Sequence, residues 1–267
     1  MSSNGAMDAA EPLDQALSPE GRAALLGRLQ QTLEGVVEGT HGELIEGLHL
    51  PEGEWVTVGR YTRLGEFTMQ VLDRVLATIG LVAISPVLLL LALAVKLDST
   101  GPAFFRQNRI GRGGRPFTFY KFRGMYVDAK ERFPHLYDYR YSQEEVQNLR
   151  FHPEADPRVT RLGHFIRRTS LDELPNLLNV VIGDMSLVGP RPEIPELLPY
   201  YGRHAKTVLT VKPGITSLAK CVGRDDLTFQ ETLELDLRYI RERELRMDLG
   251  ILFGTVWKIA TGRNVGH

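Results

Sequence analysis

Apolar residues change their spacing several times along the chain, and each change predicts a different kind of element. Residues 75–95 are 21 consecutive uncharged, mainly apolar residues. This length suits a bilayer helix, which needs about 20 residues. Ser85 and Pro86 lie near its middle. Because proline removes a backbone hydrogen bond, we expect two half-helices joined by a break over about residues 71–97. A straight spanning helix that tolerates its proline is the alternative.

The spacing changes to a period of two in FFRQNRIGRGGRPFTFYKFRGM, residues 104–125. Two short strands around the Gly-Gly turn, a β-hairpin, are predicted. Alternation along the second strand places Lys121 and Arg123 on the same face as two phenylalanines. A solvated sheet edge is the plain alternative for these two cations.

Helical spacing predicts amphipathic helices near both ends of the chain. SPEGRAALLGRLQQTLEGV begins at Ser18, a good N-cap, and has leucines on one stripe. MDLGILFGTVWKIATG carries Trp257 and Lys258 on an apolar helix, which fits either a membrane surface or core packing.

Charge divides the chain into two parts. Residues 1–60 carry ten Asp and Glu against three Lys and Arg, whereas residues 61–267 carry 23 against 29. We therefore distinguish an acidic, partly helical N-terminal extension, 1–66, from a basic remainder, 67–267, which should meet anions. Residues 99–127 hold six Lys and Arg and no acid, which predicts that this flank of the apolar run is cytoplasmic.

Composition excludes several classes of site. Cys221 is the single cysteine, so no intrachain disulfide exists. The seven histidines lack HExxH or other close ligand spacing, which argues against zinc. There is no P-loop and no GxGxxG motif.

The segment RRTSLDELPNLLNV sets Asp172 and Glu173 side by side before an apolar helical pattern. Ser170 and Glu173 fit a capping box, the structural interpretation. Pro175 argues instead for a helix that begins at Asp172, because proline is tolerated in the first turn. Free N–H groups there would favour an ionised Asp172, able to attack an electrophile.

A second rigid segment is Pro190-Arg191-Pro192. Prolines on both sides restrict the backbone, which suits a fixed guanidinium aimed at a phosphate or carboxylate. An ordinary loop is the alternative for so short a motif.

Three stretches together resemble the bacterial sugar transferases that load polyprenyl phosphate, the monotopic phosphoglycosyl transferases. They are LDRVLATIGLVAISPVLLLLALAVKLDSTGPAFFRQNRIGRGGRPFTFYKFRGM, RRTSLDELPNLLNVVIGDMSLVGPRP and VKPGIT. The resemblance covers roughly residues 67–260. It implies an α+β fold, mostly helical and monotopic, with a re-entrant helix broken at Ser85-Pro86, a small β-hairpin and amphipathic interfacial helices. It also implies an enzyme on the cytoplasmic face of the bacterial inner membrane.

The resemblance further implies a reaction. Asp172 and Glu173 would be the catalytic dyad and the ligands of Mg²⁺, the donor a UDP-sugar and the acceptor polyprenyl phosphate. Asp172 would attack the sugar-bearing phosphate and expel UMP, and polyprenyl phosphate would then attack the phosphosugar-enzyme intermediate. The partners would include the lipid bilayer, and the sequence leaves open whether the protein forms a homodimer. The residues that would bind substrate are Lys121, Arg123, Arg168, Pro190, Arg191 and Pro192.

Two departures from the family pattern concern substrate contacts. Met69-Gln70 stand where a basic pair is common, and Ser217-Leu218-Ala219-Lys220 stand where Gly-Trp/Leu-Ala-Gln is usual. Two other functional classes compete with the transferase: a catalytically idle membrane-anchored scaffold, and a nucleic-acid binder using the basic stretch 106–123. The near-neutral total charge argues against nucleic acid.

Overall fold

One long helix dominates the N-terminal part of the described chain. The computed structural model describes residues 61–150, 156–223 and 227–261, so the predicted Ser18 helix and most of the acidic extension lie outside the described residues. Helix α2, Arg63–Asp98, begins where the Thr62 side chain accepts a hydrogen bond from Gly65 N. The helix is therefore longer at its N-terminal end than the predicted range 71–97, because this cap adds two turns of mixed polarity.

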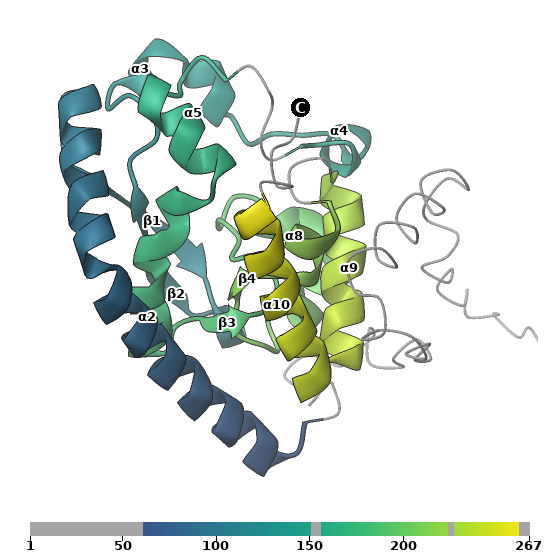
Figure 1. Cartoon of the computed structure of the whole chain (residues 1–267). Helices are drawn as coiled ribbons and strands as arrows, with labels where there is room; N and C mark the ends of the chain where they lie inside the picture. Colours follow the sequence, from purple (N-terminus) through teal and green to yellow (C-terminus); the bar gives the residue numbers. More distant parts are fainter. Residues whose placement is uncertain (1–60, 151–155, 224–226, 262–267) are drawn as a thin grey trace, which may run out of the picture.

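Helix α2 bends along its length but is not broken at Ser85-Pro86. Figure 1 shows an uninterrupted coil that changes direction along one side of the molecule. Ser85 Oγ donates to the Val82 carbonyl oxygen at 2.8 Å, so a side chain contacts the backbone close to the proline. The expected break between two half-helices is absent from α2, since Pro86 is accommodated within one helix, and the re-entrant path remains a prediction.

The surface of α2 is mainly apolar and exposed. By length and composition it is the one helix of the described residues that could cross a membrane, and 6% of its apolar window is buried. Leu89 is 72% exposed and Phe67 is 65% exposed. Exposure of so much contiguous apolar area marks a membrane or protein contact.

The predicted β-hairpin is confirmed. Strands β1, Phe104–Ile110, and β2, Pro116–Phe122, pair antiparallel across the short helix η3, Arg112–Gly114. Gly113 and Gly114 both have positive φ, 72° and 75°, which glycine adopts without strain.

The segment after the hairpin is made of short helices. They are α3, Ala129–Arg132; η4, Pro134–Tyr137; and α4, Gln143–Gln147. Helix α5, Arg161–Arg168, follows, and then η5, Leu171–Asn176, runs directly into α6, Leu177–Ile182. Gly183, with φ 102°, ends α6.

A second small sheet pairs β3, Ser186–Val188, in parallel with β4, Gly214–Thr216. The crossover between them contains η6, Leu198–His204, and α7, Ala205–Val208. A Cβ on Gly214 would meet Gly189 N at 2.1 Å. The backbone after β3 therefore touches the backbone of β4 directly, which brings the PRP and PGIT segments together.

The C-terminal helices cover the other side of the molecule from α2, with the sheets between (Figure 1). They are α8, Leu218–Val222; α9, Phe229–Glu242; and α10, Leu245–Thr261. Met247 and Ile251 of α10 are buried in the main core, whereas Phe253 and Trp257 are 71% and 54% exposed. Helix α10 thus packs on the core with one face and presents apolar side chains on another.

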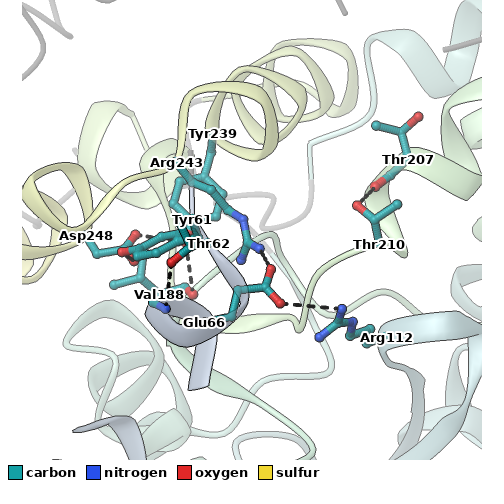
Figure 2. Close-up of polar contacts among 11 residues, drawn as sticks. Tyr61, Thr62, Glu66, Arg112, Val188, Thr207, Thr210, Tyr239, Arg243 and Asp248 are labelled. Carbon is teal, nitrogen blue, oxygen red and sulfur yellow. Dashed lines mark hydrogen bonds and ion pairs between the residues drawn. The ribbon is translucent and has the colours of Figure 1, made fainter. Parts of the chain in front are cut away.

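Polar contacts fasten the start of α2 to the C-terminal helices (Figure 2). Glu66 forms ion pairs with Arg243 and, at 3.8 Å, with Arg112. Asp248 accepts hydrogen bonds from Tyr61 Oη at 2.8 Å and Tyr239 Oη at 2.9 Å. Burial raises the pKa of Asp248 to about 6, although both hydrogen bonds oppose that rise.

Candidate active site

The predicted acidic pair lies in a cleft between β2, η5, the segment after β3, and β4 with α8. The empty space of the cleft, counted together with the open solvent at its mouth, is about 420 Å³. Its lining residues are Arg109, Phe119, Lys121, Asp172, Glu173, Asn176, Met185, Arg191, Pro192, Gly214, Ile215 and Lys220. Four cations therefore surround two carboxylates.

A left-handed residue leads the chain into the acidic pair. Ser170 has φ 59°, and it is the only described non-glycine residue with positive φ. Its side chain makes no capping hydrogen bond, and η5, a 3-10 helix, begins at Leu171. The expected capping box and an α-helix beginning at Asp172 are both wrong. The tighter η5 contains Pro175 before the α-helical pattern starts at Leu177.

Two asparagines fix η5 and α6 against the hairpin. Tyr120 N donates to Asn176 Oδ1 at 3.1 Å, and Asn179 Nδ2 donates to the Thr118 carbonyl oxygen at 2.7 Å. The bonds to the β2 backbone hold Asp172 over that strand. This function was not predicted from the sequence, although two asparagines three residues apart in an apolar helical pattern were its signal.

Asp172 is buried, with 7% of its surface exposed. Burial raises the pKa of its carboxyl group to about 6; adjacent Glu173 adds to the rise, and Lys121, Arg167 and Lys220 oppose it. The sequence analysis expected the helix start to favour ionisation, but burial outweighs that effect. At neutral pH the group is still mainly ionised.

Lys121 is a predicted cation that lines the cleft together with Asp172 and interacts with its charge. Burial lowers the pKa of Lys121 to about 8, and the Asp172 charge opposes that decrease. Its Nζ lies 5.5 Å from the centre of the Phe105 ring. The charges of Lys121 and Asp172 act on each other within the cleft, and each favours the charged form of the other, which suits phosphate chemistry.

The PRP segment contributes Arg191 and Pro192 to the cleft. Arg191 N donates to Asp236 Oδ2 at 3.3 Å, and the Pro190 carbonyl oxygen accepts from Gly214 N at 2.9 Å. Burial raises the pKa of Asp236 to about 8, against the bond and charge of Arg191. The segment is thus held by its backbone, and Pro190 supports the site from outside the lining.

Arg109 is a lining residue that the sequence analysis did not select. It is 8% exposed, donates to the Pro192 carbonyl oxygen at 2.9 Å and lies 3.5 Å from Glu193. Burial lowers the pKa of Arg109 to about 10, while Glu193 opposes this. The hairpin register offered the signal, because Arg109 pairs with Phe117 and so shares the face of Lys121.

Lys220 is the second missed lining residue. It belongs to α8, and its Nζ contacts Glu173 Oε2 and donates to the Ile215 carbonyl oxygen at 2.7 Å. The signal was its position in the segment that departs from the family pattern.

Two predicted substrate contacts lie elsewhere. The Arg123 guanidinium donates to the carbonyl oxygens of Thr100, Ser99 and Val95 at 2.7, 2.6 and 3.2 Å. Arg123 therefore caps the C-terminal end of α2, where carbonyl groups lack helical partners. Arg168 is exposed at the end of α5, and its neighbour Arg167 is the one whose charge acts on Asp172.

A sequence model described as bacterial sugar transferase matches residues 64–262, which include every element of the cleft. The chain belongs to the bacterial sugar transferase family. Curated proteins that resemble the chain are named as sugar transferases, as the family resemblance predicted.

Three relatives show the range of the family. The galactosyl transferase CpsE of Streptococcus agalactiae is 43% identical over 72% of this chain and 42% of its own. UDP-glucose:undecaprenyl-phosphate glucose-1-phosphate transferase of Escherichia coli is 43% identical over 70% and 39%. Exopolysaccharide production protein ExoY of Sinorhizobium fredii is 33% identical over 77% and 91%. The chain thus spans about two fifths of the first two relatives and most of the third.

Proposed function

We propose that this protein transfers a phosphosugar from a UDP-sugar to undecaprenyl phosphate, a polyprenyl phosphate, and releases UMP. The observation that carries the proposal is a buried carboxylate, Asp172, in a cleft that four cations line. A diphosphate donor and a phosphate acceptor bring several negative charges together, and a carboxylate nucleophile can approach them only where cations offset those charges. The names of the relatives, which include glucose and galactose donors, support the same class of reaction.

The reaction proceeds in two displacements. An Asp172 oxygen attacks the sugar-bearing phosphorus, a carboxylate–phosphorus bond forms, and the anhydride bond to UMP breaks. An oxygen of polyprenyl phosphate then attacks the same phosphorus, which releases the Asp172 carboxylate and forms the lipid diphosphate sugar. Arg109, Arg191 and Lys121 offset the phosphate charges in both steps. Glu173 assists beside the nucleophile.

Magnesium remains a prediction for this site. Among the described residues no group of three His, Cys, Asp or Glu could hold a metal, but Mg²⁺ in phosphate sites often takes only one or two carboxylates plus phosphate oxygens. Asp172 fits such a site, whereas Glu173 already contacts Lys220. A bound Mg²⁺ would neutralise phosphate charge.

We further propose that α2 enters and leaves the bilayer on the cytoplasmic side of the bacterial inner membrane. The exposed apolar surface of α2 and the outer face of α10 support a lipid contact. A UDP-sugar is water-soluble and cytoplasmic, and the acceptor is a lipid, so the cleft has to meet both phases.

The decisive experiment offers UDP-glucose, UDP-galactose and other UDP-sugars with undecaprenyl phosphate to the full chain in membranes, and measures UMP. We expect release with at least one donor. Asp172→Asn should abolish both release and covalent labelling by a donor radiolabelled in its sugar. An idle scaffold would release no UMP with any donor, and labelling that persists in the variant would place the nucleophile elsewhere.

A further inference from the structure

A lysine occupies the cleft position beside the second carboxylate of the dyad. Lys220 lies in the first turn of α8, where Ser217 Oγ accepts a hydrogen bond from Lys220 N at 3.1 Å. Its Nζ forms an ion pair with Glu173, and the two side chains are 22% and 21% exposed. The pair is largely withdrawn from water, so its charges are weakly screened.

A second acceptor holds the ammonium group in place. Lys220 Nζ donates to the Ile215 carbonyl oxygen at 2.7 Å, and Ile215 belongs to β4, whose backbone contacts the PRP segment. An ammonium has three donors. Glu173 and Ile215 account for two, which leaves one for an oxygen of a substrate phosphate in the cleft.

The positive charge of Lys220 is what a neutral side chain of similar length, such as glutamine, would not supply at this position. With glutamine at position 220, α8 would supply no positive charge to Glu173, which lies next to the Asp172 carboxylate. Two adjacent carboxylates attract a divalent cation, whereas a fixed ammonium within contact of one of them repels it.

We propose that Lys220 takes the place of a divalent cation as the partner of Glu173, so that Glu173 is not a metal ligand in this chain. Lys220 is then a positioning residue: it holds Glu173 in the cleft and supplies a fixed positive charge near the donor phosphates. The proposal rests on the proposed function for its catalytic meaning, but not for its test. We expect divalent cations to bind Asp172 and Glu173 weakly in this protein. They should also contribute less to turnover than in a Lys220→Gln variant.

The test measures Mn²⁺ binding to the purified full chain without donor, by electron paramagnetic resonance. Removal of one adjacent positive charge should let Lys220→Gln bind Mn²⁺ about tenfold more tightly than the unaltered protein. Lys220→Met should behave in the same way, and it serves if the glutamine variant does not fold. Lys220→Arg keeps the charge and should keep the weak binding.

A double substitution separates ligand recovery from a general charge effect. In Glu173→Gln/Lys220→Gln the gain in Mn²⁺ affinity should disappear, because the recovered ligand is Glu173. Equal affinity of the unaltered protein and both neutral variants, including no binding by any of them, would overturn the proposal, as would a gain that survives loss of Glu173.

Turnover provides the second readout. The Mg²⁺ concentration for half-maximal UMP release should fall about tenfold in Lys220→Gln, with restoration in Lys220→Arg. If the unaltered protein releases no UMP with any donor, the transferase proposal fails while the Mn²⁺ titration still decides the role of Lys220. An unchanged Mg²⁺ requirement in an active Lys220→Gln enzyme would count against the role of Lys220 alone.

Discussion

The Asp172 carboxylate lies where burial and function oppose each other. The folded protein raises its pKa from 3.8 to about 6, mainly by burial. When a carboxyl group has a higher pKa in the folded state, the protein loses stability as the pH rises from the unfolded-state pKa to the folded-state pKa. The reason is that the unfolded state gives up its proton first. Above about pH 6 the folded protein therefore carries the full cost of this charge.

Asp172→Asn should consequently stabilise the protein at pH 7.5 by about 2 kcal/mol, and the gain should vanish below about pH 4. Denaturant unfolding of the purified protein at several pH values measures it. The matched control is Asp156→Asn: burial raises the pKa of Asp156, but its bonds with Arg158 outweigh that and lower it. This control should destabilise at pH 7.5, and an equal loss in both variants would contradict the assignment.

Individual site residues were predictable where local pattern alone placed them. Asp172, Glu173 and Lys121 follow from short motifs. Arg109 and Lys220 reach the cleft through contacts distant in sequence, such as the 47 residues that separate Lys220 from Glu173. Arg123 was predicted to bind substrate but lies at the end of α2 instead. Its partners are backbone carbonyl oxygens, which no sequence pattern marks.

At the scale of elements, backbone contact between Gly189 and Gly214 joins the PRP and PGIT segments. Gly189 N donates to the Thr216 carbonyl oxygen at 3.0 Å and Gly214 N donates to the Pro190 carbonyl oxygen at 2.9 Å. The hairpin, the end of α6 at Gly183 and an apolar α10 could be predicted because each depends on neighbouring residues. The parallel pairing of β3 with β4 could not, since each strand has three residues and its partner lies far along the chain.

Gly214→Ala should lower the free energy of unfolding by about 3 kcal/mol, because the added methyl group would overlap backbone atoms that cannot move aside. The same variant should release UMP slowly, since Arg191 would be displaced. Gly80→Ala is the control: its Cβ would meet only Leu177 Cδ1 at 3.8 Å, and alanine favours a helix. Comparable losses in both variants would show that the close approach is not what matters.

At the scale of the whole molecule, α2 carries most of the exposed apolar surface that we propose contacts the bilayer. A helix of 36 residues is about 54 Å long at 1.5 Å per residue, longer than a hydrocarbon core of about 30 Å. Its length therefore allows either a crossing or a bent path that returns to the same side. Pro86 lies inside the helix, and because proline weakens helical hydrogen bonding it favours the second path.

Replacing Ser85 with leucine and Pro86 with alanine should straighten α2 and let the N-terminus cross the membrane. Gly5→Cys, in a chain that also carries Cys221→Ser, reports the side through an impermeant thiol reagent on intact cells. We expect no labelling before the two substitutions and labelling after them. Labelling of the chain that keeps Ser85 and Pro86 would establish a spanning topology instead.

The attachment of Arg123 to the last turn of α2 has a consequence for the acceptor. Lys121 lines the cleft, and Arg123, two residues later, is hydrogen-bonded to the C-terminal end of α2. Strand β2 is therefore attached to the end of that helix. Under the proposed function, these hydrogen bonds fix the distance of the reacting phosphorus from the bilayer midplane. We therefore expect carrier lipids to be selected by the height at which they present their phosphate, in addition to the chemistry of that phosphate.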